Sequence, residues 1–198
     1  METMKTKKPR KEDQRTRLTK LMIRQAFLRL LEERPINEIT VSELCEAAGI
    51  SRVTFYLHYK NIFDLNDKIK ENFYKEIQDS LIPLLTGDKK NLPDEKMVDT
   101  ILRVLYENRD IISAMVGKAR DMEFVKTIIG YGHDVVLGLY PKLFTNKAEK
   151  DFNIFYTYVS GGVMSIIRLW VNNNFQDSIE ELSSNIRKLI AVTIKYFD

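Results

Sequence analysis

The chain has 198 residues, 44% of them hydrophobic and 30% charged, which are the proportions of a globular protein large enough for one or two cores. Its single cysteine excludes an internal disulfide, and its five prolines and eight glycines leave room for long helices. Residues 1–60 carry 13 Lys and Arg against 8 Asp and Glu, a balance of +5, whereas the remainder carries 18 against 20, so the N-terminal part suits a polyanionic partner.

Residues 1–13 are expected to form a flexible basic arm ahead of the first helix. Its positive side chains, with two just beyond it, are Lys5, Lys7, Lys8, Arg10, Lys11, Arg15 and Arg17. Arms of this kind bind phosphates or enter the minor groove of DNA. A solvated tail without a partner is the open alternative.

A first helix is expected over residues 14–33, and Pro35 follows its end. The apolar side chains expected on one of its sides are Leu18, Met22, Ala26, Phe27 and Leu30.

The stretch 40–60 is the most informative part of the chain. Thr40 and Glu43, three residues apart, have the spacing of a capping box at the start of a helix. Gly49 suits the end of that helix, where a positive φ is needed, and Ser51 can cap the next one. Two short helices joined by a tight turn are typical of a DNA-binding helix-turn-helix. The alternative is an ordinary amphipathic pair with a solvated polar face.

The second of these helices offers side chains that suit a DNA duplex. Arg52 is the best candidate for reading a base, because a guanidinium pairs bidentately with guanine. Phosphate contacts are expected from Thr54, Tyr56, Tyr59 and Lys60. Phe55 is expected in the core.

The segment from Ile39 to Leu65 resembles the N-terminal domain of the TetR family of transcriptional regulators, and the resemblance extends over about 14–66. It includes the Ala-Gly-Ile-Ser turn, the Thr-Phe-Tyr segment and the aromatic Tyr59 before the next helix. The resemblance implies an all-α homodimer with a DNA-binding domain at 14–65, for a palindromic operator, and a helical ligand-binding and dimerisation domain at 66–198. It places the DNA contacts on Thr40, Ser51, Arg52, Thr54, Tyr56, His58, Tyr59 and Lys60.

One position departs from the family pattern. The family usually has a lysine at the start of the fourth helix, where this chain has Ile62. The customary phosphate contact is therefore not carried over to this position, and Lys60 is the available substitute.

The rest of the chain is also expected to be helical, which gives an all-α fold class. Asn61 with Asp64 can cap a helix that runs toward Ile82 and is closed or kinked by Pro83. Further helices are expected over 96–107, directly after Asn108, and over 122–140, 147–172 and 178–196, with a polar loop at 86–95. No run alternates in the manner of a half-buried strand.

The segments 147–172 and 178–196 are the expected dimer surface. The first is apolar around much of its circumference, which an exposed helix on a monomer would not tolerate. Ser160, Gly161 and Gly162 leave a gap in which another backbone can approach closely. The resemblance implies a four-helix bundle made from two such helices of each subunit. The alternative is that both helices only fill the core of their own domain.

Aromatic and Met side chains are frequent in the C-terminal part and suit an apolar or aromatic small-molecule effector. Gly130, Gly132 and Gly138 can make room for it, and tyrosine hydroxyls and an imidazole can orient it. The candidate ligand-binding residues are Tyr106, Phe124, Tyr131, His133, Phe155, Tyr158 and Trp170. For each of them, ordinary helical core is the alternative.

The sequence contains no constellation typical of an enzyme. Cys45 and His58 are expected on different helices of the motif, and neither a phosphate-binding glycine loop nor clustered metal ligands are found. No apolar stretch is expected to reach the length of a membrane span, and the first residues lack the apolar core of a signal peptide, so a cytoplasmic location is expected.

The chain is therefore interpreted as a DNA-binding regulator that is not an enzyme and has no cofactor or metal. It is expected to be a ligand-responsive repressor that binds its operator as a homodimer. The alternative is a co-regulator of the same fold that acts through a protein partner instead of a small molecule.

Overall fold

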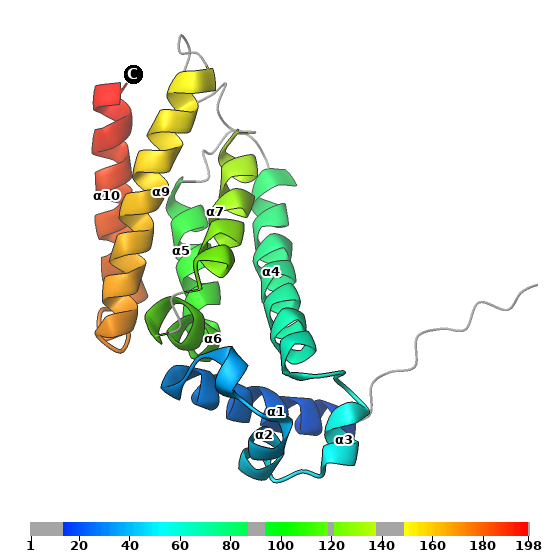
Figure 1. Cartoon of the computed structure of the whole chain (residues 1–198). Helices are drawn as coiled ribbons and strands as arrows, with labels where there is room; N and C mark the ends of the chain where they lie inside the picture. The colour runs from blue at the N-terminus through cyan, green and yellow to red at the C-terminus, as the bar shows by residue number, and fades with distance from the viewer. Residues whose placement is uncertain (1–13, 87–93, 119–120, 138–148, 198) are drawn as a thin grey trace, which may run out of the picture.

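The computed structural model describes residues 14–86, 94–118, 121–137 and 149–197, and within these ranges every regular element is a helix. The predicted all-α fold is confirmed. Figure 1 shows α1 (Gln14–Glu33), α2 (Val41–Ala48) and α3 (Arg52–Tyr56) at the base, with the other helices rising from them. The predicted basic arm, 1–13, lies outside the described residues.

The N-terminal helices begin and end where their capping residues predict. The Glu43 N–H donates to the Thr40 hydroxyl at 3.3 Å, and the Glu43 carboxylate accepts from the Thr40 N–H at 3.1 Å, which completes the capping box. Gly49 ends α2 with φ +66°. The Ser51 hydroxyl accepts from the Thr54 N–H at 3.1 Å and starts α3.

The buried side of α1 differs from the predicted one. Ala26 and Phe27 are buried as predicted, but Leu18 and Met22 are exposed, by 59% and 37%. The other buried residues of the helix are Ile23, Leu28 and Leu31. The reason is that α1 packs against both α2 and the segment Ser113–Lys118, so its buried surface is wider than one stripe and excludes its first turns.

The C-terminal part is built from the helices that follow α3. They are α4 (Ile62–Thr86), α5 (Asp94–Glu107), α6 (Arg109–Ile112), α7 (Met122–Leu137), α9 (Glu149–Asn172) and α10 (Ile179–Phe197). The predicted cap of α4 is confirmed, since the Asp64 N–H donates to the Asn61 side chain at 2.9 Å. However, α4 does not close at Pro83 but continues to Thr86. Residues 138–148, which include the predicted end at 140 and the start at 147, lie outside the described residues.

A π-helix over Ser113–Lys118 was not predicted. Three successive residues in it, Ala114, Met115 and Val116, are almost fully buried, which the wider π turn permits. This segment packs against α1, α7 and α9, and it therefore joins the base of the molecule to the rest. After it, the Asp121 N–H donates to the Met115 carbonyl at 2.8 Å.

Asp121 connects three elements. Its carboxylate accepts from the Phe124 N–H at 2.9 Å at the start of α7, and it also pairs with the ammonium of Lys70 on α4. Partial burial alone would raise the pKa of Asp121, but the Lys70 ammonium and the Phe124 N–H outweigh it and hold this pKa below its usual value.

The expectation that no apolar stretch reaches the length of a membrane span was wrong for α9. The stretch Asp151–Asn172 is 22 residues long with a mean hydropathy of 1.3, so by length and composition alone it could cross a membrane. Only 22% of its most apolar window is buried within the chain. Most residues of that window are therefore not buried by the described part of the chain.

Gly49→Ala tests the left-handed end of α2. A Cβ at this position would meet nothing within 4 Å, so the expected loss of about 1–2 kcal/mol in the free energy of unfolding comes from the backbone alone. Gly130→Ala is the matched control, since a Cβ there also meets nothing, and it should stabilise α7 by about 0.5–1 kcal/mol. Urea unfolding of both variants provides the comparison, and equal shifts would contradict the assignment.

Asp121→Asn tests the ion pair with Lys70. The variant should lose about 1–3 kcal/mol of unfolding free energy at pH 7, because a partly buried ammonium loses its charged partner. A carboxyl whose folded pKa is depressed stabilises above its unfolded pKa, and this contribution disappears as pH falls through the folded value. The difference between wild type and variant should therefore shrink below about pH 4. Asp67→Asn, at an exposed position of α4, should show no such difference, and a pH-independent gap would refute the pairing.

Candidate nucleic-acid interface

The helix α3 lies at an outer corner of the base and is held by one buried side chain (Figure 1). Phe55 has no exposed surface, as predicted. The side chains around it point outward, and Val53, Tyr56 and Leu57 are 73%, 57% and 75% exposed. A short helix anchored on one aromatic ring therefore presents most of its surface to solvent.

Arg52 is exposed at the first position of α3. Its guanidinium donates to the Ser42 hydroxyl of α2 at 2.6 Å. This hydrogen bond links the two helices of the motif across the turn and limits the directions that the guanidinium takes. Its remaining N–H groups face solvent and can bind an acceptor.

The hydroxyls predicted to contact DNA also cap the helices that carry them. The Thr40 hydroxyl donates to the Glu43 carboxylate at 2.7 Å, and the Ser51 and Thr54 hydroxyls lie 2.9 Å apart. The hydrogen bond from Thr40 is the main reason that the pKa of Glu43 lies below its usual value. The carboxylate therefore stays ionised, and the cap stays closed, at neutral pH.

Tyr59 and His58 lie further inside than the other candidates. Tyr59 is only 8% exposed, and its ring centroid is 5.7 Å from that of Phe55. His58 is half-buried, and Tyr56 and Lys60 are exposed. The structure therefore brings the candidates together at one corner but gives the Tyr59 ring a packing role.

Lys68 was missed by the sequence reasoning. Its ammonium donates to the His58 carbonyl at 3.2 Å and to Asp64 at 2.9 Å, and it lies 5.3 Å from the centroid of the Tyr59 ring. Ile62, at the position where the family usually has a lysine, is buried and uncharged. Lys68, farther along α4, supplies a second positive charge near Lys60. The only sequence signal was its spacing of four residues from Asp64.

Asp64 fixes the backbone at this corner. Its carboxylate accepts from the Lys60 N–H at 2.8 Å, and this hydrogen bond, followed by that from Lys68, lowers the pKa of Asp64. The position of Lys60 is thus held through its own backbone while its side chain remains exposed.

The single cysteine, Cys45, is a buried thiol. Cys45 is 4% exposed on α2, and burial raises the pKa of its thiol against the opposing charge of Arg52. The neutral thiol therefore acts as a small apolar core group.

The seven residues predicted to bind a ligand fall into separate places. Phe124 and Tyr131 of α7 pack with Tyr74 of α4, at ring distances of 5.5 and 5.8 Å. Tyr106 stacks on Trp170 at 5.9 Å, near the far end of α9.

The other three lie elsewhere along α7 and α9. His133 contacts the Asn153 side chain at 3.0 Å. Phe155 is buried, whereas Tyr158 is 71% exposed on the outer side of α9. The described residues therefore do not gather these seven side chains around one space.

Two polar links hold α1 to the elements above and beside it. The Arg24 guanidinium reaches both carboxylate oxygens of Asp110 on α6, at 2.8 and 2.9 Å. At the other end of α1, Arg34 pairs with Glu43 of α2 at 3.2 Å. The base is thus fixed to the upper helices by an ion pair in addition to the apolar contact with the π-helix.

Two family models match the chain. The model described as bacterial regulatory proteins, tetR family, matches residues 23–66, and a model for the C-terminal region of transcriptional regulators of this type matches 94–191. A curated relative, the uncharacterized HTH-type transcriptional regulator YxbF of Bacillus subtilis, is 26% identical over 171 residues. That match covers 85% of this chain but 44% of the relative, so the chain spans less than half of that protein's length.

Solved structures share the fold. The dihydroxyacetone kinase operon activator DhaS superposes with a TM-score of 0.61 at 22% identity, covering 91% of this chain and 98% of its own. The regulator FadR from Bacillus subtilis, solved in complex with stearoyl-CoA, gives 0.62 at 16% identity, covering 86% and 96%. At these identities the likeness concerns the fold alone.

Proposed function

The chain belongs to the TetR family of transcriptional regulators, and from this premise we propose that it is a ligand-responsive repressor that binds a palindromic operator as a homodimer. The observation that carries the proposal is the exposed corner at α3, where Arg52 and hydroxyl groups surround a helix anchored by Phe55. This arrangement suits the major groove, where the N-terminal residues of a recognition helix meet base edges. A cytoplasmic location belongs to the same proposal.

The chemistry of the corner divides into base and phosphate contacts. Arg52 is assigned to a guanine, and the exposed Val53 and Leu57 suit thymine methyl groups. The phosphate contacts are assigned to Thr40, Ser51, Thr54, Tyr56 and Lys60. His58 and Tyr59 contribute to them only through the atoms that remain exposed. Lys68 joins this group as the cation that compensates for Ile62.

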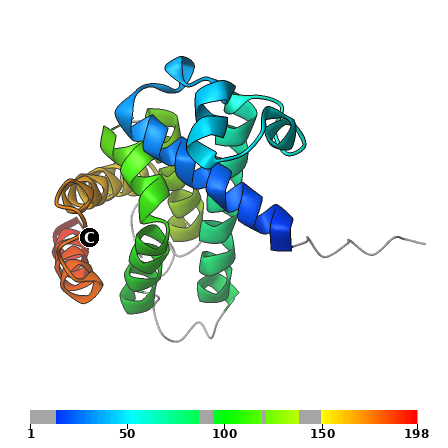
Figure 2. The ribbon, with the colours of Figure 1, turned by 90° about the horizontal axis from the view of Figure 1, so that it is seen from below.

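The proposed dimer surface lies on α9 and α10. Figures 1 and 2 show these two helices side by side at one edge of the molecule. Five large apolar side chains on them are more than half exposed, namely Ile154, Tyr158, Leu169, Leu189 and Val192. A Cβ on Gly161 or Gly162 would meet nothing within 4 Å, so the middle of α9 is open to a second backbone. A dimer would cover the apolar surface that α9 leaves uncovered and would pair two recognition helices for adjacent half-sites.

The effector is proposed to be a small molecule, and the stearoyl-CoA complex of FadR supports this class of control within the fold. The aromatic contacts between α4 and α7, around Tyr74, Phe124 and Tyr131, are the best candidate region among the described residues. A ligand there can act on DNA binding only if it binds one spacing of the recognition helices better than another. The helix α4 connects the two regions, since it carries buried Ile62 next to α3 and Tyr74 farther along.

Fluorescence anisotropy with DNA from upstream of the protein's own gene, against a scrambled duplex, tests DNA binding. Arg52→Ala should cost about 1–3 kcal/mol mainly on the specific site, whereas Lys60→Ala should weaken all sequences alike and reduce the salt slope by about one. Lys126→Ala, an exposed lysine of α7, is the control and should change neither. An unchanged salt slope for Lys60→Ala would remove its phosphate assignment.

If the wild type discriminates against the scrambled duplex only when a second protein is added, the co-regulator alternative is supported instead. Binding by the purified chain alone, with two protomers per site, supports the repressor proposal.

Leu169→Glu and Leu189→Glu test the dimer surface. Each places a carboxylate in the proposed apolar contact and should weaken self-association by about 2 kcal/mol or more, because the charge loses water without gaining a partner. Sedimentation equilibrium measures the dimer dissociation constant, and Leu18→Glu, at an exposed position of α1, is the control. A wild type that stays monomeric at high concentration, or variants that dimerise as tightly as it does, would refute this surface.

A further inference from the structure

Ser42 is an exposed residue of α2 that was not among the predicted DNA contacts. Its hydroxyl oxygen accepts a hydrogen bond at 2.6 Å from the guanidinium of Arg52, ten residues further along the chain. A helical Ser or Thr usually bonds to a carbonyl one turn earlier in its own helix, as Thr19 and Ser80 do here. The Ser42 hydroxyl instead contacts a charged side chain of the next helix.

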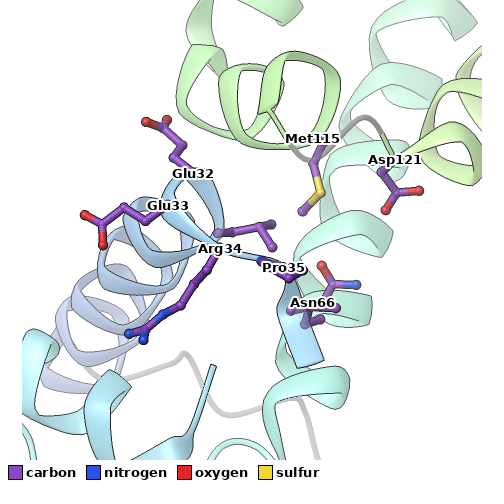
Figure 3. A pocket seen from close by; sticks show the side chains of 9 residues that line it. Glu32, Glu33, Arg34, Pro35, Asn66, Met115 and Asp121 are labelled. Atoms are coloured by element: carbon purple, nitrogen blue, oxygen red, sulfur yellow. The ribbon is translucent and has the colours of Figure 1, made fainter. Parts of the chain in front are cut away.

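The helix that carries Ser42 is firmly placed. On its inner side, Leu44 and Cys45 are 0% and 4% exposed. Next to Ser42, the Glu43 carboxylate completes the capping box and pairs with the Arg34 guanidinium at 3.2 Å. Figure 3 shows that this Arg34 side chain points away from the neighbouring cavity at the end of α1. The Ser42 hydroxyl is therefore presented by a helix that is fixed both by burial and by an ion pair.

The helix α3, which carries Arg52, has less support. It is five residues long, and Phe55 is its buried residue. An arginine side chain has many rotamers, and it loses this freedom when it binds a partner. A hydrogen bond to α2 restricts the Arg52 side chain before DNA arrives, so less freedom is lost on binding.

The partner of Arg52 is neutral, which distinguishes it from other arginines of the base. The Arg24 guanidinium reaches both carboxylate oxygens of Asp110, so its charge is compensated within the protein. Among the described residues, Arg52 is paired with no carboxylate, and the Ser42 hydroxyl orients it without cancelling its charge. The other N–H groups of the guanidinium remain available for the O6 and N7 atoms of a guanine.

The hydrogen bond between Ser42 and Arg52 contributes little to the stability of the fold. Both side chains are exposed, and water can replace either partner of an exposed hydrogen bond. Alanine is also a better helix former than serine. Loss of the Ser42 hydroxyl should therefore leave the helix-turn-helix folded, and its consequence is expected in DNA reading.

We propose that Ser42 is a positioning residue for base recognition. It holds the Arg52 guanidinium in the direction from which this group reads a guanine, and it thereby sets the base preference at that one position of the operator. This inference rests on the proposed DNA-binding function and on the assignment of Arg52 to a guanine.

The test begins with the purified full chain and duplexes that contain a random central segment. The duplex selected by the wild type is then prepared with each of the four bases at the position whose preference Arg52→Ala abolishes. Fluorescence anisotropy measures the affinity of each version. Ser42→Ala should reduce the preference for guanine at this position about two- to tenfold, the effect of releasing one flexible side chain. The salt slope and the preferences at other positions should stay unchanged, because no cation is removed.

Two further variants separate positioning from a general effect on the fold. Ser42→Thr retains a hydroxyl and should restore the preference for guanine. Ser80→Ala, the same change on α4, removes a hydroxyl that bonds to the Glu76 carbonyl and should alter no preference. Urea unfolding of Ser42→Ala should match that of the wild type.

A double-mutant cycle tests whether Ser42 acts through Arg52. In the Arg52→Ala background, Ser42→Ala should have no effect at the guanine position, because the group that it positions is absent. Additive effects of the two substitutions, or a loss of affinity spread equally over all duplexes, would overturn the positioning role. Equal behaviour of Ser42→Thr and Ser42→Ala would overturn it as well.

The outcomes distinguish this inference from the function on which it rests. A wild type that selects a duplex, together with an unaffected Ser42→Ala, would overturn the role of Ser42 alone. If Arg52→Ala changes no single position, the guanine assignment and the role of Ser42 are both overturned. If the wild type selects no duplex, the proposed function is overturned, and the role of Ser42 with it.

Discussion

The packing of α1 on the π-helix is the contact on which the rest of the structure depends. The helix α1 supplies the core of the helix-turn-helix through its contact with α2, and it also packs against Ser113–Lys118 above it. Its buried residues belong to one continuous apolar cluster that reaches as far as α10. The Arg24–Asp110 ion pair fixes the same two layers to each other with a directed polar contact. Because the corner that carries α3 shares this core, a displacement of α1 is expected to displace α3 as well.

This single core explains how events in the C-terminal helices can reach the corner that is proposed to bind DNA. The turn at the end of α3 is fixed to α4 by Asp64 and Lys68, and α4 is fixed to the start of α7 by Lys70 and Asp121. The Asp121 N–H in turn closes the segment that supports α1. Two routes, one through α4 and one through the π-helix, thus connect the C-terminal helices to α1 and α3.

The sequence predicted the elements far better than the contacts between them. The bounds of α1 and the caps at Thr40, Ser51 and Asn61 were predicted, because each depends on side chains within three or four residues of the backbone that they cap. The π-helix left no such signal, since its wider turn is stabilised by the burial of Met115 and its neighbours against other helices. The helix α4 continued beyond Pro83, which was expected to close or kink it, as far as Thr86. The predicted ligand residues were dispersed because aromatic content does not specify which rings face each other.

By itself the sequence determined the all-α class, the helix-turn-helix with its capping residues, and the family, because these depend on local spacing and on a contiguous motif. The tertiary structure alone decided that Tyr59 packs inside the corner and that Lys68 supplies a second cation there. These features join residues from different helices, and their energies depend on burial and on the distance between charges. Neither quantity exists until the helices have packed.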